Sequence, residues 1–543
     1  MMDTELLISL CKSVKYFRSF LLEEDDDEDE YIENNMNTNT TSSSNNHSSI
    51  PPLSIPKEIR HHSELQSLFR YRKPYKVPRI HVNNITPLQF LQQYVIPHKP
   101  VILLGATNEW NAHVNWIGKQ GLHYLSNHHN IMENEKIYGH PTCTFTPNGR
   151  ADAIYQNIHA SNTVTFSSSS SSSDTIHTSR TTLTTQIPAD IFVQPEEQAL
   201  PFSTILSLLQ ERAMHPKYCD NCNKNKPSSA SSDPIHSTTS VSENNISSTL
   251  PSSLPCGYAY LSVQNDNLRQ QLPYLLTDLG KEDIAKVHIG TEALGNNPDA
   301  INIWIGYHGN ISSIHKDHYE NLLTVIAGVK RFVINPPSDI LWLYEKLYPT
   351  GKFIHNKQKC TMESVNECSF LFSTTNNNTT ASLPLPSCWS IQCDVLTDYT
   401  QDSNDPTQAS SLSTSPVTIP WISIDPANPD YEKYPLSYFS SPITVDVHAG
   451  ETFYLPSLWY HQVSHPFTFG CQSCGKDRYQ RKPQYSRVAI TKEEEQQYNI
   501  QDSNDNTGMT IAINSWYDMN YLSQNWAYFN TMKEIANSVT RQV

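Results

Sequence analysis

The sequence predicts a mainly β fold with flanking helices, built as a sandwich or a barrel. Many short segments rich in β-branched and aromatic residues are separated by Gly and Pro, a pattern typical of antiparallel β architectures. Apolar residues make up only 37% of the 543 residues, below the roughly 45–50% of globular domains, and long polar segments account for the difference. We therefore expect one large domain that carries polar insertions.

Helices are expected at both ends of the chain and within it. Residues 1–22 place apolar side chains at three- and four-residue intervals, which predicts an amphipathic helix that packs on the domain or binds a partner. Residues 202–212 predict a second amphipathic helix, and residues 520–535 a C-terminal one. The strand candidates lie at residues 100–105, 257–264, 301–306, 322–326, 330–335, 443–447, 452–455 and 509–516.

Polar segments divide the chain. Residues 23–56 begin as an acidic run and become rich in Asn, Thr and Ser, so we expect a disordered linker there. Residues 57–543 are expected to form the single domain. Its polar insertions bury too little apolar surface to offset the entropy of ordering them. They lie near residues 161–186, 219–255, 361–416 and 466–508.

Charge and targeting signals argue against several classes of partner. The net charge is −16, and nine of the 54 acidic residues lie between residues 23 and 33, so the remainder is only mildly acidic. Nucleic acids and anionic membranes bind clustered basic residues, and we expect neither partner. We find no apolar stretch of 18 residues and no signal peptide, which predicts a cytosolic or also nuclear protein whose eleven cysteines are reduced.

A histidine and a carboxylate two residues apart are candidate metal ligands, because alternate residues of a strand point to the same side. About two such pairs are expected by chance in this composition, so the spacing alone does not identify a site. It occurs three times, at His62/Glu64, His315/Asp317 and His318/Glu320.

Sequence context favours His315 and Asp317. They lie between the strand candidate at 301–306 and the apolar run that begins at residue 322, and His461 follows another apolar strand in ETFYLPSLWYHQV. Two histidines and one carboxylate form a facial triad, which holds Fe(II) by one octahedral face and leaves three positions open. Histidines that bind no metal, buried or on the surface, are the alternative interpretation.

A lysine near this candidate triad predicts an anion site. Lys330 lies thirteen residues beyond Asp317, and a turn at Gly328 allows both side chains to face the same interior. An inward lysine is costly unless it pairs with an anion. Ser312 and Asn321 offer neutral hydrogen bonds, so the group would hold a small dicarboxylate. The alternative is that Lys330 is exposed to solvent on an edge strand.

Three segments together resemble a known family. NIWIGYHGNISSIHKDHYENLLTVIAGVKRFVINPPSD is similar to the first metal-ligand segment of jumonji-C oxygenases, in the branch of factor-inhibiting-type hydroxylases. ETFYLPSLWYHQV resembles the second ligand segment of this family, and IAINSWYDM the strand that follows it. The resemblance implies a double-stranded β-helix, the jelly-roll core of cupins. It covers residues 78–158, 187–218, 256–358, 417–466 and 508–535.

The resemblance also implies the roles of individual residues. His315, Asp317 and His461 would be the Fe(II) ligands. Lys330 would pair with the distal carboxylate of 2-oxoglutarate, helped by Ser312, where the family commonly has Thr. Further polar positions of the pocket would be Asn321, Asn514 and Tyr260, with Trp516 in the pocket wall.

The implied activity is protein hydroxylation. Iron, 2-oxoglutarate and dioxygen would hydroxylate C3 of a lysine in a protein substrate, which the resemblance suggests is a GTP-binding protein of the developmentally regulated type. A peptidase that cleaves histone tails at methylated arginine and a non-catalytic scaffold are the alternatives. The intact ligand set counts against the scaffold. A homodimer through the terminal helices is one oligomeric state consistent with this family.

Two further motifs lie outside these segments. Cys219/Cys222 and Cys471/Cys474 have Cys-x-x-Cys spacing, so four thiolates would suffice for a structural zinc site, although free thiols are the simpler interpretation. The basic stretch RYRKPYKVPR, residues 70–79, is a candidate nuclear-localisation or phosphate-binding patch, or a solvated approach to the domain.

Overall fold

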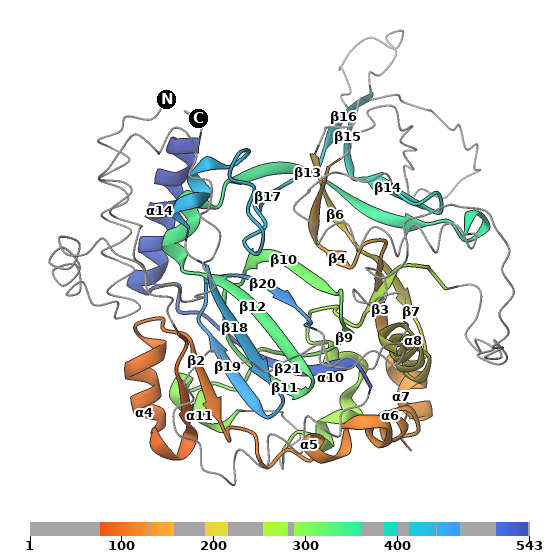
Figure 1. Ribbon diagram of the computed structural model, residues 1–543, viewed down its shortest axis with the longest axis vertical. Coiled ribbons are helices and arrows are strands. Elements are labelled where there is room, and N and C mark those ends of the chain that lie inside the picture. The colour runs from red at the N-terminus through yellow and green to blue at the C-terminus, as the bar shows by residue number, and fades with distance from the viewer. Residues whose placement is uncertain are drawn as a thin grey trace, which may run out of the picture.

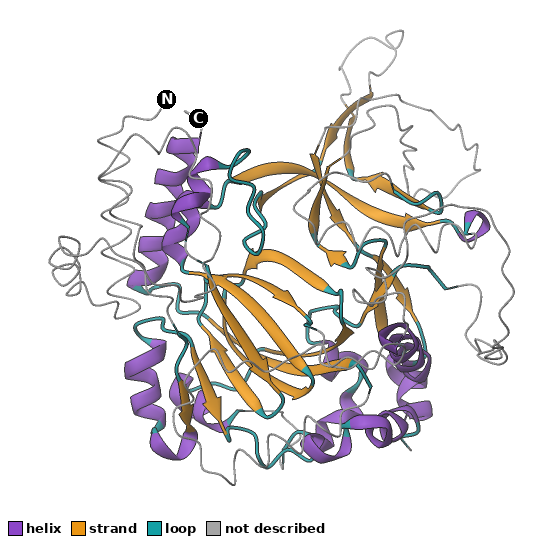
Figure 2. Ribbon diagram, in the orientation of Figure 1, coloured by secondary structure: helices purple, strands orange, loops and turns teal. Residues whose placement is uncertain are grey.

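Two β-sheets packed face to face form the centre of the protein in a computed structural model (Figure 1, Figure 2). The predicted N-terminal helix, the acidic linker and the Cys-x-x-Cys pairs all lie outside the residues that the structure describes. The described residues are 76–128, 131–156, 190–214, 254–280, 287–360, 385–399, 412–440, 442–466 and 507–540.

The larger central sheet has six strands, all antiparallel to their neighbours except the edge pair β1 and β2. Near-continuous apolar sequence in these strands explains why they are buried on both faces. In spatial order they are β1 (Arg79–His81), β2 (Val101–Leu104), β19 (Glu451–Leu455), β11 (Tyr319–Ala327), β21 (Met509–Asp518) and β9 (Ala300–Tyr307).

The second central sheet has five strands and carries the chemically reactive side chains. Its strands alternate apolar with polar residues more than those of the first sheet, as in the buried and half-buried alternation of β18. In spatial order they are β18 (Ile443–His448), β12 (Val329–Asn335), β20 (Tyr460–Ser464), β10 (Ile311–Lys316) and β4 (Arg150–Ala151).

The chain passes back and forth between the two sheets, which makes the core a jelly roll. Strands β9 to β12 alternate between the sheets, and so do β18 to β21. Apolar side chains from both sheets meet between them, and Phe332 of β12 packs edge-to-face on Phe453 of β19 with ring centroids 5.0 Å apart. This arrangement confirms the predicted mainly β fold with a jelly-roll core.

A tight turn at Gly328 joins β11 to β12. Gly328 has a φ of +75°, and a Cβ atom there would lie 2.6 Å from the Thr510 hydroxyl oxygen and 2.8 Å from the Met509 carbonyl oxygen. Glycine meets both requirements because it has no side chain. The turn therefore occurs where the sequence predicts it, and it brings Lys330 back into the interior.

Smaller sheets surround the jelly roll. Strand β13 is the longest of the described strands. It pairs with β14 and β6 in one flanking sheet and also with β17, so it connects β17 to that sheet. The flanking strands are β3 (Thr142–Thr146), β5 (Ala153–Gln156), β6 (Asp190–Gln194), β7 (Glu196–Ala199), β8 (Tyr258–Tyr260), β13 (Glu345–His355), β14 (Trp389–Cys393), β15 (Val395–Tyr399), β16 (Leu412–Pro416) and β17 (Thr418–Ile422).

Helices cover the outside of the sheets. The C-terminal helix α14 lies along one side, and α5 to α8 gather at another part of the molecule (Figure 1). No helix among the described residues is long and apolar enough to cross a membrane. The helices are α4 (Pro87–Phe90), α5 (Ala112–Asn115), α6 (Gly118–Ser126), α7 (Ile131–Tyr138), α8 (Phe202–Met214), α10 (Asn267–Gln271), α11 (His288–Leu294), α14 (Gln524–Thr540) and the short turns η1 (Val82–Asn84), η2 (Leu91–Val95), η4 (Pro273–Asp278), η5 (Pro337–Trp342), η6 (Lys357–Lys359) and η7 (Pro435–Phe439).

One polar segment contributes more structure than its composition predicts. The polar segment at 361–416 was expected to contribute no core, yet its described part forms β14, β15 and β16. Trp389 of β14 is only 5% exposed and packs against Phe353 of β13. A single buried aromatic can anchor a strand whose other residues are polar, and a composition-based boundary misses it.

Candidate functional site

Strands β10 and β20 bring the predicted triad together. The two strands are antiparallel neighbours, and His315 lies directly opposite His461 with the ring centroids 4.3 Å apart. Asp317 follows β10 immediately, and its Oδ2 is 3.5 Å from His461 Nε2. One ligand atom from each of the three residues lies within 4.8 Å of the others, which is the spacing of a facial triad.

Backbone carbonyls orient both imidazole rings. His315 Nδ1 lies 2.7 Å from the Ser313 carbonyl oxygen, and His461 Nδ1 lies 2.9 Å from the Trp459 carbonyl oxygen. A carbonyl only accepts hydrogen bonds, so each Nδ1 carries the proton and donates it. The Nε2 lone pairs therefore remain free to bind a metal, as in most histidine metal sites.

Burial sets the protonation states that a metal ion needs. Desolvation, followed by the nearby His461, lowers the pKa of His315 to about 4, so its ring is neutral near pH 7. Burial alone would raise the pKa of Asp317. The close contact with His461, whose Nε2 lies 3.5 Å from Asp317 Oδ2, and the neighbouring imidazoles outweigh it and hold the pKa below its usual value. His315 thus presents a neutral nitrogen and Asp317 an anionic oxygen.

The structure also assigns a different role to the His318/Glu320 pair. Glu320 accepts hydrogen bonds from the hydroxyls of Tyr454 (2.6 Å) and Ser457 (2.8 Å), so its carboxylate is used within the protein. The His318 ring packs edge-to-face on Trp526, with centroids 5.6 Å apart. This pair is therefore structural, and the His62/Glu64 pair lies outside the described residues.

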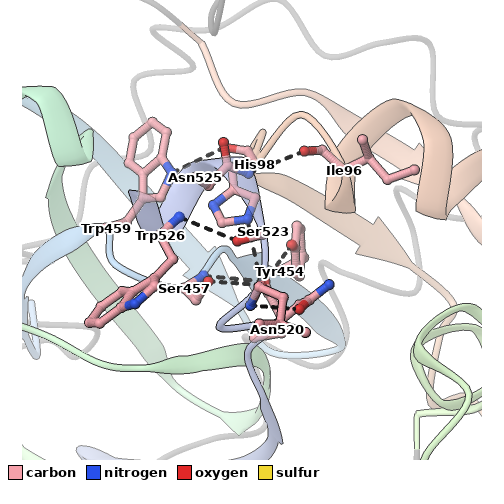
Figure 3. A network of polar contacts seen from close by, with 11 residues as sticks. Ile96, His98, Tyr454, Ser457, Trp459, Asn520, Ser523, Asn525 and Trp526 are labelled. Atoms are coloured by element: carbon pink, nitrogen blue, oxygen red, sulfur yellow. Dashed lines mark hydrogen bonds and ion pairs between the residues drawn. The ribbon is translucent and has the colours of Figure 1, made fainter. Parts of the chain in front are cut away.

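A polar network supports the strand that carries His461 (Figure 3). The Trp459 indole donates to the His98 carbonyl oxygen at 3.0 Å, and the Trp459 carbonyl is the group that orients His461. Two residues before His98, the Ile96 carbonyl oxygen accepts a hydrogen bond of 3.4 Å from Asn525 of α14. The network thus holds β20 against the segment after η2 and the start of α14.

The triad opens into a pocket with about 390 Å³ of empty space. All of the residues that the sequence predicted for the site line this pocket. They are His315, Asp317, His461, Lys330, Ser312, Asn321, Asn514, Tyr260 and Trp516.

Lys330 is a buried cation at the inner part of this site. It is 2% exposed, its Nζ donates to the Tyr260 hydroxyl at 3.2 Å, and Nζ lies 5.0 Å from the centre of the Trp304 ring. Burial lowers its pKa to about 7, and no described carboxylate forms an ion pair with it. The interpretation of Lys330 as a solvent-exposed residue is therefore wrong, and the pocket offers a place for an anion.

Neutral polar groups complete the pocket. Burial raises the pKa of Tyr260, and a hydrogen bond with Ser312 partly offsets the effect, so the Tyr260 hydroxyl stays protonated and available as a donor. Asn514 accepts a hydrogen bond from the Trp304 indole at 2.9 Å. The buried Asn321 Oδ1 has no hydrogen-bond partner among the described residues. Both Asn321 and Lys330 line the pocket: the buried cation fits an anionic ligand, and the buried Oδ1 fits a hydrogen-bond donor such as a water molecule held with it.

Sequence analysis missed several residues of this site. Trp304 of β9 lies over Lys330, although its strand was identified, because strand patterns do not show which aromatic residue lines a pocket. Trp421 of β17 stacks on His315 with ring centroids 6.4 Å apart and planes 9° apart. Trp421 lies in the segment 417–466 that carries the family resemblance, but about a hundred residues from His315, and nothing in the sequence pairs the two.

The basic stretch at residues 70–79 is described only at its end. Arg79 of β1 forms an ion pair with Glu451 at 2.9 Å and donates to the Asp446 carbonyl oxygen at 2.8 Å. Arg79 therefore stabilises the edge of the larger sheet. The remaining interpretation of this stretch as a phosphate or localisation patch stays a prediction for residues outside the described part.

Comparisons with known proteins show the family of this chain. The sequence model described as "Cupin-like domain" matches residues 87–523. A protein of Dictyostelium discoideum named JmjC domain-containing protein E is 27% identical over 455 residues, which cover 83% of this chain and 86% of that protein.

Two further relatives carry names that state an activity. The human protein named bifunctional peptidase and (3S)-lysyl hydroxylase JMJD7 is 24% identical over 453 residues, covering 83% of this chain and 87% of that protein. The Arabidopsis thaliana protein named lysine-specific demethylase JMJ32 is 28% identical over 284 residues, covering 51% of this chain and 56% of that protein.

Proposed function

Since the chain belongs to the cupin-like domain family and its relatives are JmjC proteins, we propose that it is an Fe(II)- and 2-oxoglutarate-dependent protein lysyl hydroxylase. The observation that carries this proposal is the triad of His315, Asp317 and His461 at the mouth of a pocket that also contains the buried Lys330. A two-histidine, one-carboxylate face suits non-haem Fe(II), and a buried ammonium suits a dicarboxylate cosubstrate.

Each residue of the pocket has a defined task in this proposal. The triad residues would hold the iron through the two Nε2 atoms and the Asp317 carboxylate. Lys330 would pair with the distal carboxylate of 2-oxoglutarate, and the hydroxyls of Tyr260 and Ser312 would orient it. When bound, iron with 2-oxoglutarate and dioxygen supplies the oxidant and yields succinate and carbon dioxide.

The side chains of the pocket would also orient the reaction and exclude water. Trp304 and Phe332 line it with apolar surface, and Trp516 stacks on Tyr319 with parallel rings 4.8 Å apart, which fixes the wall. Excluding water matters because the oxidant must react with the substrate C–H bond.

We propose a lysine C3 position as the target and a GTP-binding protein of the developmentally regulated type as the substrate. The name of the human relative includes (3S)-lysyl hydroxylase, and that protein matches most of this chain. Peptidase activity is the second candidate, because the same name includes it. The pocket contains no Ser or Cys paired with a base, so peptide cleavage would need a metal-activated water.

We also propose an oligomeric state and a cellular compartment. We propose a homodimer through the terminal helices. Of the two predicted terminal helices, the structure describes α14, and Leu522, just before it, is 96% exposed. We propose the cytosol, and also the nucleus, as the compartment, consistent with the described cysteines forming no disulfide with one another.

The test is to incubate the full chain with Fe(II), 2-oxoglutarate and candidate GTP-binding proteins, and to measure intact masses and peptide fragments. A gain of one oxygen on lysine, coupled to succinate formation, supports hydroxylation. New chain termini would instead show proteolysis, and loss of a methyl group from methyl-lysine would show demethylation. His62→Ala is the control, since it alters a His-x-carboxylate pair of the same spacing to which the proposal gives no role.

A further inference from the structure

A second cluster of metal-binding side chains lies in the flanking sheets. It consists of Cys256, His355, Cys360 and Cys388, and one ligand atom from each lies within 4.8 Å of all the others. The sulfurs of Cys256 and Cys388 are 3.3 Å apart, and Cys256 Sγ is 3.6 Å from His355 Nε2. None of these residues lines the pocket of the triad.

The fold brings these residues together from segments far apart in the sequence. Cys256 comes just before β8, His355 ends β13, and Cys360 ends the short turn η6. Cys388 comes just before β14, and its carbonyl accepts a hydrogen bond of 2.7 Å from the backbone N–H of Asn356. The pairing of β13 with β14 therefore places Cys388 beside His355, and β8 contributes Cys256 from another sheet.

The distances fit one ion better than a disulfide. A disulfide needs sulfurs about 2.05 Å apart, much closer than the 3.3 Å between Cys256 and Cys388. Around a tetrahedral zinc, ligand bonds of about 2.0–2.3 Å place two sulfurs about 3.8 Å apart and a sulfur and a nitrogen about 3.5 Å apart. The observed sulfur–nitrogen distance of 3.6 Å agrees with these values, and the 3.3 Å between the sulfurs lies between a disulfide bond and the tetrahedral distance, nearer to the latter.

We propose that Cys256, His355, Cys360 and Cys388 bind a structural Zn²⁺ ion. Three thiolates and one imidazole are the Cys₃His set of structural zinc sites, and four protein ligands leave no position for water or substrate. Thiolate sulfur also favours zinc over the hard divalent ions. The site would therefore stabilise the fold and take no part in oxidation.

The surroundings of the cluster support this assignment. Cys256 and His355 are each 8% exposed and Cys388 is fully buried, whereas Cys360 is half-buried, so an ion there would be shielded from water on every side but that of Cys360. Zinc with three thiolates carries a net charge of −1. Arg212 of α8 supplies a nearby positive charge, since it donates to the carbonyl of Pro255, the residue before Cys256. A purely apolar packing role would explain buried cysteines but not a histidine among them.

The zinc site would join three structural units. It would tie the β13–β14 pair to β8, and β8 continues to Tyr260, which contacts Lys330 in the pocket. The expected effects of losing the ion are thus a lower thermal stability and only an indirect change at the pocket. This site is distinct from the Cys-x-x-Cys pairs considered from sequence, since its ligands show no such spacing.

The experiment measures metals in the full chain purified with zinc and reducing agent. We expect one zinc per chain in addition to iron. Cys360→Ser and Cys388→Ser should lose the zinc, and Asp317→Ala should lose iron and keep the zinc. Cys393→Ser is the matched control, because Cys393 is half-buried on β14 like the half-buried Cys360, yet is not in the cluster.

A second measurement avoids any folding defect of the variants. In the wild-type chain, cobalt in place of zinc should give the absorption of a tetrahedral thiolate site. Removing zinc should speed the alkylation of Cys360 but not of Cys393, as mapped by peptide mass. Absence of zinc from the reduced wild type overturns the proposal. So does zinc retained in Cys360→Ser and Cys388→Ser, or an alkylation rate at Cys360 that zinc does not change.

Discussion

The candidate catalytic triad and the cysteine cluster place their ligand atoms equally close, within 4.8 Å, yet they are built for different purposes. The triad has three ligands, lies on two core strands and opens into the pocket. The cluster has four ligands, three of them thiols, gathered where separate flanking strands begin or end. Proximity marks both as candidate metal sites, but ligand number and surroundings decide whether a metal there would react or only stabilise.

The two regions also differ in how their ligands are held. Backbone carbonyls within the same strands fix the rings of His315 and His461, so the triad depends on the local register of β10 and β20. The cluster depends on three segments meeting, and one of its ligands, Cys256, belongs to a different sheet. We therefore expect mutations in the triad to affect chemistry, and mutations in the cluster to affect stability.

The largest expected effect is the loss of turnover in Asp317→Ala. Removing the anionic ligand should abolish iron binding at stoichiometric Fe(II) and lower 2-oxoglutarate turnover to background. The zinc content and the thermal unfolding temperature should stay close to those of the wild type, because Asp317 is not part of the cluster. Turnover at the wild-type rate by the iron-reconstituted variant would contradict the assignment of the triad.

The next effect is on cosubstrate affinity. Lys330→Ala leaves the distal carboxylate of 2-oxoglutarate buried without a cation, a loss of about 2–5 kcal/mol, or on the order of 30-fold or more. Titration of 2-oxoglutarate into Mn(II)-loaded protein measures this directly. Iron and zinc contents should not change, since Lys330 is a ligand in neither site.

Lys330→Arg sharpens this test. The planar guanidinium is larger than an ammonium and must fit between Tyr260 and Trp304, so it should recover only part of the affinity. Equal 2-oxoglutarate affinity in wild type, Lys330→Ala and Lys330→Arg would show that the cosubstrate does not use this cation.

The two sites should respond to pH in opposite directions. Burial lowers the Lys330 pKa from 10.5 to about 7, so Lys330 is charged below pH 7 and loses its proton above it. Binding that needs the charged form should weaken as pH rises, by up to about tenfold per unit above pH 7. Zinc binding by thiolates weakens instead as pH falls. A 2-oxoglutarate affinity that does not change between about pH 6.5 and 8.5 would contradict the prediction for Lys330. Lys330→Ala is the control, because it lacks the group whose charge changes.

The smallest effect is expected from Tyr260→Phe. This change removes the hydrogen bond between the Tyr260 hydroxyl and Lys330 Nζ and should weaken 2-oxoglutarate binding by about 3- to 10-fold. Tyr258→Phe is the matched control, because Tyr258 lies on the same strand and stacks on Tyr307 rather than on Lys330. An equal loss in both variants would indicate a general disturbance of β8.

Sequence patterns predicted the core strands where apolar runs are continuous. Strands β9, β11 and β12 agree closely with the segments at 301–306, 322–326 and 330–335. Strand β10 was missed because ISSIHK is mostly polar, and its residues alternate in burial only weakly. His315 and the adjoining Asp317 were nevertheless identified as candidate ligands. Metal binding requires particular residue types at a particular spacing, and this spacing is visible in the sequence even where the apolar pattern of a strand is not.

The cysteine cluster could not be predicted in the same way. Its ligands come from three segments, and no short motif joins Cys256 to His355 or Cys360 to Cys388. The Cys-x-x-Cys pairs attracted attention because their spacing is local. Contacts between residues of distant strands cannot be predicted from local patterns in a single sequence. The stacking of Trp421 on His315 is another example.

The pairing of His315 with His461 has a consequence for the life of the chain in the cell. Strand β20 is synthesised long after β10, and the strands and insertions between them come first. A ribosome-bound chain would therefore carry only two of the three candidate iron ligands until His461, 146 residues after His315, has emerged. Because a slip of one residue would turn His461 to the opposite face of the sheet, tight retention of iron would mark a chain that has completed this pairing in the correct register.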